Sequence, residues 1–429
     1  MLMYSNAELA NIPVGQFEMI GARLTTPCNQ RVSGPSVLLV GFSVRAMAQC
    51  ANRAGFSSVA IDACADRDLL AICREYRPLS GDWLSWVNEF FPDVPIILGG
   101  GMEHKLNELS ELACLRSAEG NTTLQAMAQL RSLNRWQQWA HRSGLSWPRT
   151  VRSCVQAETL AVGDLDSAWL AKPERSVGGL GIEQMHRLDR STLDAFFENC
   201  PNRYLQKKRN GVAVGVTFLS SQHGATVVGC TAAQECRVQP FVPQFLYRGS
   251  TGPIPLDQHS MNQLVRFSEL VSQETNIMGL WQADFIVESG DWCLLEINPR
   301  WTASMEIFDT VFDIRLVDLH RKCQDCSIDS IEWNRTSVQL RERSLSPILS
   351  RLTKVILYAP RDLVISQEMS DDWWVLRWTG EVPIDGCRIA DIPSPGSQVA
   401  FGQPVFTAIS FDQATAESFV KQLSKRLSQ

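Results

Sequence analysis

Three oxygen-bearing side chains near residue 290 have the types and spacing of a divalent-metal site. Asp284 lies in one apolar run, and Glu296 and Asn298 lie at the end of a second run. The spacer 288–291, Glu-Ser-Gly-Asp, predicts a hairpin turn between two strands. Because strand side chains alternate, Glu296 and Asn298 point to the same face, and strand pairing brings Asp284 towards them.

Such hard oxygen ligands suit Mg²⁺ and the phosphates that the ion bridges. Arg300 follows Asn298 by two residues and adds a planar cation suited to phosphate. At this point an alternative stays open, in which the hairpin merely turns these polar residues towards water.

A lysine followed by a Ser/Gly loop forms a second chemical signal. Lys172 ends the apolar run 168–171, and Pro173 disfavours helical backbone at the lysine. The loop residues with the freedom and donors to surround a phosphate are Ser176, Gly178, Gly179 and Gly181. The Walker A loop has its lysine after the glycines, so this is a different phosphate site or an ordinary hairpin loop.

Composition restricts the class of protein. The chain has 429 residues, 45% hydrophobic and 20% charged, with net charge −6 and no basic run, which argues against nucleic-acid binding. No apolar run approaches the roughly 18–20 residues of a membrane helix, and the N-terminus lacks a signal-peptide layout. The 13 scattered cysteines fit reduced thiols in a cytoplasm. The lone pair Cys323/Cys326, just after His320, is weak evidence for zinc.

The elements that must position these residues begin with a β-α-β unit, which implies a parallel sheet. Its parts are a strand at 36–40, a helix at 45–54 and a strand at 58–61. Gly41 supplies only the first glycine of a dinucleotide fingerprint, which makes NAD binding the weaker reading. The glycine run 99–101 after a third strand suits a ligand-binding edge or a tight turn.

Periodicity predicts the remaining elements. Residues 1–34 are expected to form an irregular arm, and 321–350 a charged connector with some helix. Helices are expected at 123–143, 191–200 with Ser191 as N-cap, 257–277 and 414–428. Strands are expected at 94–98, 203–208, 212–219, 225–230, 354–358, 364–366, 373–378 and 404–409.

Taken in order, the strand lysine with its loop and the later motif Leu-Glu-Ile-Asn-Pro-Arg at 295–300 resemble the ATP-grasp superfamily of ligases. The nearest resemblance is to carbamoyl-phosphate-synthase and biotin-carboxylase-like carboligases. It implies an α/β and α+β protein with a Rossmann-like domain and N-terminal arm at 1–120. A two-subdomain ATP-grasp clamp at 121–320 follows, divided at about 203/204, and then a small, mostly-β C-terminal α/β domain at 321–429.

The resemblance also implies roles for residues. Lys172 would contact the ATP phosphates, and Arg300 would stabilise the acyl phosphate, which makes these two the catalytic residues. The cofactor-binding set comprises Lys172, the lid residues Ser176, Gly178, Gly179 and Gly181, and the adenine hinge Gln206, Lys207 and Lys208. The metal set, for Mg²⁺ or Mn²⁺, comprises Asp284, Glu296 and Asn298. The usual Asp-Lys pair is missing from the 123–143 helix, where Arg131 or Arg135 substitutes.

The implied activity is ATP-dependent ligation of a carboxylate to an amine through an acyl phosphate, in cofactor or secondary-metabolite synthesis. A bicarbonate-activating carboxylase component and an ATP-binding subunit without turnover remain alternatives. Small-molecule acid and amine are the expected partners, a homodimer is left open, and nucleic acid and membrane are not expected. Candidates for the acceptor pocket are Glu103, His104, Tyr247, Arg248 and Ser304.

Overall fold

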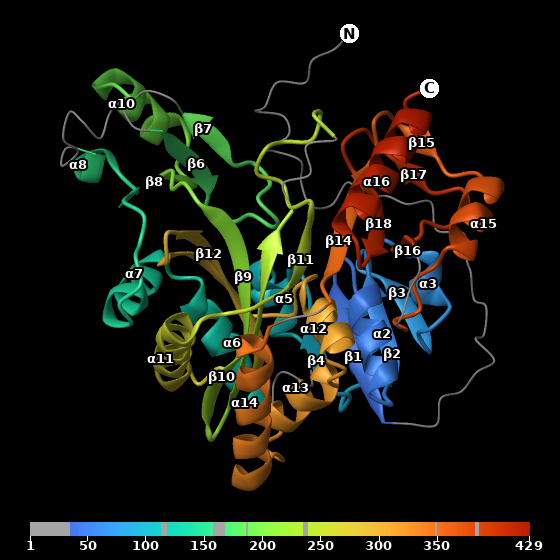
Figure 1. Ribbon diagram of the computed structural model, residues 1–429, viewed down its shortest axis with the longest axis horizontal. Helices are drawn as coiled ribbons and strands as arrows, with labels where there is room; N and C mark the ends of the chain where they lie inside the picture. The colour runs from blue at the N-terminus through green and yellow to red at the C-terminus, as the bar shows by residue number, and fades with distance from the viewer. Residues whose placement is uncertain are drawn as a thin grey trace.

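A computed structural model describes residues 35–112, 118–157, 168–185, 188–234, 239–347, 350–381 and 386–429. The expected arm at 1–34 lies outside these ranges. In the described part, no helix is long and apolar enough to cross a membrane. Three main sheets build the molecule (Figure 1).

The N-terminal sheet is parallel, with strand order β3-β2-β1-β4. Its strands are β1 (Ser36–Gly41), β2 (Ser57–Asp62), β3 (Glu75–Pro78) and β4 (Ile96–Leu98). The accompanying helices are α2 (Arg45–Arg53), α3 (Arg67–Leu70), α4 (Trp83–Phe90), η1 (Met102–His104) and α5 (Leu106–Leu109). β1 and β2 are almost wholly buried because helices cover both faces, so the expected β-α-β unit is confirmed.

The prediction of a single helix at 123–143 is wrong in one respect. Two helices occupy the region, α6 (Ala118–Leu130) and α7 (Leu133–Arg142), and Ser132 between them is extended. The indole N–H of Trp136 donates to the Leu130 carbonyl at 2.6 Å. Breaking the helix therefore lets both segments pack their apolar residues into one core with helix α11 (Gln258–Thr275).

A small antiparallel sheet, ordered β5-β8-β6-β7, carries the strand lysine. Its strands are β5 (Thr150–Val151), β6 (Trp169–Pro173), β7 (Glu183–Met185) and β8 (Arg203–Lys207), with helices α8 (Cys154–Ala157) and α10 (Arg190–Asn199). Ser191 as N-cap is corrected to Asp189, whose Oδ1 accepts from the Thr192 amide at 2.7 Å. Both residue types are good caps, and the carboxylate two residues earlier reaches the free amide.

The third sheet has eight strands in the order β13-β12-β9-β10-β11-β14-β18-β16. They are β9 (Val212–Ser221), β10 (Gly224–Ala233), β11 (Gly249–Ile254), β12 (Gly279–Glu288), β13 (Asp291–Asn298), β14 (Leu352–Tyr358), β16 (Arg388–Ala390) and β18 (Pro404–Ser410). Helices α12 (Met305–Val311), α13 (Leu316–Gln324) and α14 (Ser330–Leu345) follow the hairpin. Because β11 pairs with β14, the sheet continues without a break into the C-terminal third.

The C-terminal third holds one further correction. Of residues 373–378, expected as a strand, the first three belong to helix α15 (Gln367–Val375), which Ser366 caps through the Met369 amide, and Arg377 forms an isolated bridge to Ile389. Trp373 packs edge-on against Phe406, so its burial comes from a helix face instead of a strand. The strands β15 (Leu363–Val364) and β17 (Gln398–Val399) pair apart from the main sheet, and α16 (Gln413–Leu427) ends the chain. In Figure 1 this red region lies beside the blue N-terminal sheet.

Candidate active site

One large cavity, of about 1630 Å³, is lined by residues from all three sheets. Lys172 of β6, Asp284 of β12 and Lys354 of β14 all line it. Gly99 and Gly100, the residues that follow β4, also line it, so the glycine-rich strand exit faces a ligand-sized space. Separate layers of the fold therefore meet at a single chamber.

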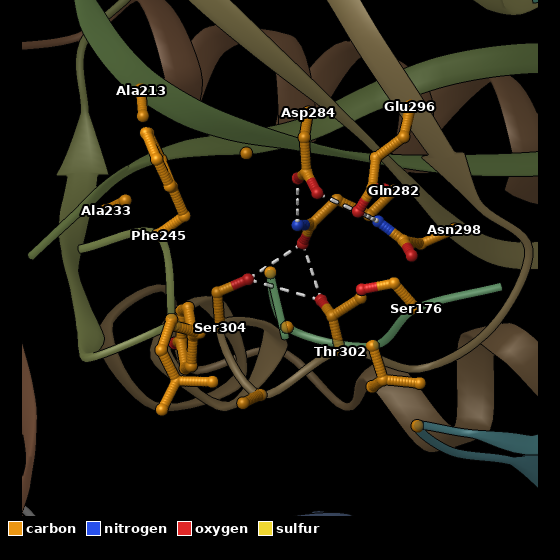
Figure 2. A pocket seen from close by; sticks show the side chains of 18 of the residues that line it. Ser176, Ala213, Ala233, Phe245, Gln282, Asp284, Glu296, Asn298, Thr302 and Ser304 are labelled. Atoms are coloured by element: carbon orange, nitrogen blue, oxygen red, sulfur yellow. Dashed lines mark hydrogen bonds between the residues drawn. The ribbon is translucent and has the colours of Figure 1, made fainter. Parts of the chain in front are cut away.

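The expected metal residues lie together on the β12–β13 hairpin, as Figure 2 shows. Asp284 pairs directly with Glu296, because a bulge between Asp284 and Phe285 shifts the register by one residue. Asn298 Nδ2 donates to Asp284 Oδ2 at 2.9 Å and to Glu296 Oε1 at 3.3 Å. The turn at Ser289 and Gly290 has positive φ at both residues, as a tight hairpin requires.

The charge state of this pair favours a cation. Burial, and then the neighbouring Glu296, raise the pKa of Asp284 to about 7. Within the described ranges neither carboxylate forms an ion pair. Two acids beside the Asn298 amide, with no cation paired to them among the described residues, fit a hard divalent ion such as Mg²⁺.

Arg300 lies beside this group, and hydrogen bonds at two of its guanidinium nitrogens hold it in place. Its Nε donates to Glu103 Oε1 at 2.8 Å, and its Nη2 donates to Asn298 Oδ1 at 3.1 Å. Burial opposes ionisation of Glu103, but Arg300 outweighs it and holds the pKa of that carboxyl below its usual value. The ion pair therefore joins the N-terminal domain to the hairpin and orients the guanidinium.

Lys172 is buried and faces the two acids. Burial lowers its pKa, while Glu296 and Asp284 act in the opposite direction. Its Nζ donates to Gln206 Oε1 at 3.2 Å, and Gln206 Nε2 donates in turn to Thr150 Oγ1 at 3.2 Å. Gln206 thus lies behind the lysine and orients it.

Not every expected cofactor residue reaches the chamber. Lys208 lines it, with Nζ donating to Gln184 Oε1 at 2.8 Å. Gly181, Gln206 and Lys207 are described but lie outside its lining. Of the expected hinge residues, Lys208 therefore lines the cavity directly, and Gln206 contacts it through Lys172.

The expected lid loop lies closed over the chamber. Gly178, Gly179 and Gly181 all have positive φ, and a Cβ on Gly179 would lie 1.9 Å from the Phe245 carbonyl oxygen. The Gly178 carbonyl accepts from the Tyr247 amide at 2.8 Å. Glycine is therefore required here because the backbones approach so closely.

Of the two arginines expected to replace the missing Asp-Lys pair, Arg131 lines the cavity and Arg135 does not. The acceptor candidates Glu103, His104, Tyr247, Arg248 and Ser304 all line it. His104 Nε2 lies 3.1 Å from the Ser176 carbonyl, which ties the lid to the N-terminal domain.

The sequence analysis missed a hydrogen-bond network that supports the expected metal residues Asp284, Glu296 and Asn298, here called the metal group. Gln282 Nε2 donates to Asp284 Oδ1 at 2.7 Å, and Gln282 Oε1 accepts from Thr302 at 2.5 Å and Ser304 at 2.8 Å (Figure 2). A side chain at Gly215 would meet Gln282 Nε2 at 2.6 Å. The strand period placed Gln282 on the Asp284 face, which was the available signal.

The Cys323/Cys326 pair has no metal-site geometry. Cys323 is buried and Cys326 is exposed, and His320 uses Nδ1 to accept from the Leu280 amide at 2.8 Å. In the part of the chain that the structure describes, no three His, Cys, Asp or Glu side chains group closely enough to hold a metal. The expected site on the hairpin is compatible with this absence, because its third expected ligand, Asn298, is not one of these four residue types.

Comparison with known proteins finds a match for one domain and solved structures of similar fold. Residues 136–304 match the model of an ATP-grasp domain. None of the curated proteins is a significant match. Solved structures share the fold at low identity: an ADP complex of PurK, N5-carboxyaminoimidazole ribonucleotide synthetase, has 14% identity and a TM-score of 0.60, covering 92% of this chain and 98% of that one.

Two further similar structures are carboxylases. The biotin carboxylase domain of Hydrogenobacter thermophilus 2-oxoglutarate carboxylase has 13% identity and a TM-score of 0.61, covering 88% of this chain and 86% of that one. Rhizobium etli pyruvate carboxylase T882A has 13% identity and a TM-score of 0.63 over 92% of this chain. This chain spans only 39% of that larger enzyme.

Proposed function

Given an ATP-grasp domain at residues 136–304, we propose that this protein is an ATP-dependent ligase that joins a carboxylate to an amine. The observation that carries the proposal is the grouping of Asp284, Glu296 and Asn298 with two cations, Lys172 and Arg300, around one cavity. Uncompensated acids beside fixed cations suit a metal–nucleotide complex and the anion formed from it.

ATP and Mg²⁺ are the proposed cofactors. The PurK structure contains ADP, and the Hydrogenobacter domain contains MgADP and bicarbonate. Asp284, Glu296 and Asn298 would hold Mg²⁺, with Mn²⁺ as a substitute, and the bound ion would neutralise phosphate charge. Lys172 and the lid amides at 176–181 would position the phosphates.

The proposed reaction has two steps. A carboxylate oxygen attacks the γ-phosphorus of ATP, and ADP leaves with the electron pair of the broken P–O bond. The amine nitrogen then attacks the acyl carbon, losing a proton, and inorganic phosphate leaves. Arg300 would stabilise the oxyanion of the second step, and the closed lid would keep water from the acyl phosphate.

Bicarbonate activation is the second candidate, because the similar structures include carboxylases and one with bound bicarbonate. It uses the same first step with bicarbonate as the acid. An ATP-binding subunit without turnover is a third reading, and the complete metal group with Lys172 and Arg300 argues against it.

All the cysteines that the structure describes are free thiols, which supports a cytoplasmic setting.

The test is ADP release from Mg-ATP against a panel of amino acids, amines and bicarbonate. We expect one acid–amine pair to stimulate release, and Glu296→Gln to reduce it at least about a thousandfold, in line with loss of a catalytic metal ligand. Glu288→Gln is the matched control, because this residue is exposed at the other end of the same hairpin.

Each other outcome discriminates between the candidates. Stimulation by bicarbonate alone would replace the amine ligase with the carboxylase. Release that persists unchanged in Glu296→Gln would contradict the metal assignment. No release and no Mg-ATP shift in melting temperature would contradict nucleotide chemistry altogether.

A further inference from the structure

Part of the cavity lining comes from elements other than the hairpin, and we call this part the acidic recess. It is bordered by Asp66 from the N-terminal domain and by Asp391 and Thr407 from the C-terminal third. These two parts dock closely here: the Asp391 amide donates to Asp68 Oδ2 at 2.9 Å, and the Arg67 amide donates to the Ile392 carbonyl at 2.7 Å.

The acidic recess is continuous with the metal group. Tyr247 lines the same cavity, and its hydroxyl lies 2.8 Å from Ser250 Oγ. Burial raises the pKa of Tyr247 to about 12, and the carboxylates of Asp284 and Asp391 both add to the shift. The acidic recess and the hairpin residues therefore belong to one chamber.

The cations that border the acidic recess already have partners. Arg45 is fully buried and donates to Gln49, Glu306 and Asp391. Lys354 donates to Glu306 and to the Ala303 carbonyl. Both are held by the Glu306 carboxylate, and Arg248, which also lines the cavity, donates to three backbone carbonyls.

Most of the acids nearby are also used within the fold. Asp62 accepts from the amides of Val44, Cys64 and Ala65. Asp391 accepts from Arg45 and Thr407, although its side chain stays 23% exposed.

Asp66 differs from these acids. It is 6% exposed, it precedes helix α3 without capping it, and its Oδ2 has no hydrogen-bond partner among the described residues. Burial, and then Asp391 and Asp62, raise its pKa well above the usual value. A buried carboxylate with no partner costs free energy that a bound cation would recover.

The geometry favours an organic cation. No described group of three acids, histidines or cysteines is close enough to enclose a metal ion. An anionic group, such as the phosphate of a ribonucleotide, would face Asp66 and Asp391, while the described cations that border the recess, Arg45 and Lys354, are already paired with Glu306. An ammonium carries three donors, which match carboxylate oxygens and the Thr407 hydroxyl.

We propose that the acidic recess binds a protonated aliphatic amino group of the acceptor substrate, with Asp66 as its principal partner and Asp391 beside it. The assignment rests on the proposed function, since it names the class of amine that the ligase takes. It selects basic amines over amides, anilines and phosphorylated nucleosides.

The first test measures binding without turnover. Butane-1,4-diamine is titrated into the full chain with Mg-ADP, and saturation-transfer NMR gives the affinity. We expect Asp66→Asn to weaken binding at least about tenfold and Asp82→Asn to leave it unchanged; Asp82 also precedes a helix without capping it, but is exposed. Equal binding to wild type and Asp66→Asn, no binding to wild type, or preference for succinate would each overturn the proposal.

The second test separates this inference from the proposed function. Hydroxylamine, mostly uncharged at pH 8, intercepts an acyl phosphate as a hydroxamate. In Asp66→Asn we expect unchanged carboxylate-dependent hydroxamate formation and at least a tenfold higher KM for the basic amine. Stability in urea should be unchanged or increased, because the variant removes a buried acid that has no partner. No hydroxamate in wild type would contradict the ligase alone, whereas an unchanged amine KM in the variant would contradict the acidic recess alone. Asp66→Ser provides a second, smaller variant.

Discussion

Two groups of buried charges lie along the same cavity, and they differ in how the charges are paired. Between the N-terminal domain and the C-terminal third, Glu306 accepts from Arg45, Lys354 and the Trp378 indole. At the hairpin, Asp284 and Glu296 face each other and are joined only through amide groups. The first group is complete within the fold, while the second lacks a cation.

The difference shows in the acids themselves. Burial works against ionisation at Glu306, but Arg45 and Lys354 outweigh it and hold the pKa of Glu306 far below its usual value. Burial and a neighbouring acid raise the pKa of Asp284 to about 7. Pairing of buried charge, more than its mere presence, therefore separates a structural group from one that awaits a ligand.

The largest expected effect comes from breaking the complete group, which consists of Glu306, Arg45 and Lys354. Glu306→Gln leaves Arg45 and Lys354 buried without their counter-charge, so we expect a loss of about 3–5 kcal/mol in the free energy of unfolding. Urea denaturation monitored by tryptophan fluorescence measures it. Glu332→Gln removes a half-exposed partner of Lys322 and should cost less than about 1 kcal/mol. Equal losses of unfolding free energy in the two variants would contradict the view that Glu306 belongs to a complete structural group.

A buried group that stays neutral gives an intermediate effect. Burial, and then Arg321, lower the pKa of His320 to about 3, so the unfolded chain binds a proton that the folded chain does not between pH 6.5 and 3. Stability should therefore fall as the pH drops below about 6.5, by about 1.4 kcal/mol per pH unit.

His320→Gln keeps an acceptor for the Leu280 amide and removes the titration, so this loss between pH 6.5 and 5 should largely disappear from its urea curves. The exposed His259→Gln is the control and should retain the wild-type slope. Parallel pH curves for wild type and His320→Gln would contradict the neutral buried state.

The smallest effect on stability belongs to the incomplete group. Asp284→Asn removes one of two like charges and retains an oxygen acceptor, so the variant without metal should be unchanged or gain up to about 2 kcal/mol at pH 8. The gain in melting temperature on adding Mg-ADP should be lost. A large destabilisation would mean that Asp284 belongs to a complete structural group after all.

Much of the site could be predicted because it depends on short-range regularities. The strand period and the Glu-Ser-Gly-Asp turn brought Asp284 towards Glu296 and Asn298, and the pairing confirms that they share a face. The parallel N-terminal unit followed from two apolar runs separated by a helix. The errors also arose locally: Ser132 interrupts a continuous apolar period, and Trp373 lies on a helix in a segment rich enough in aromatic residues to read as a strand.

The sequence alone determined the types of group that reach the cavity, since alternation, turn residues and glycine positions act over a few neighbouring residues. Only the tertiary structure decided which charges are paired. Arg45 and Glu306 are 261 residues apart, and Asp68 accepts from the Asp391 amide, 323 residues further along the chain. Whether a buried carboxylate has a partner depends on packing between distant segments, and local sequence carries no record of that packing.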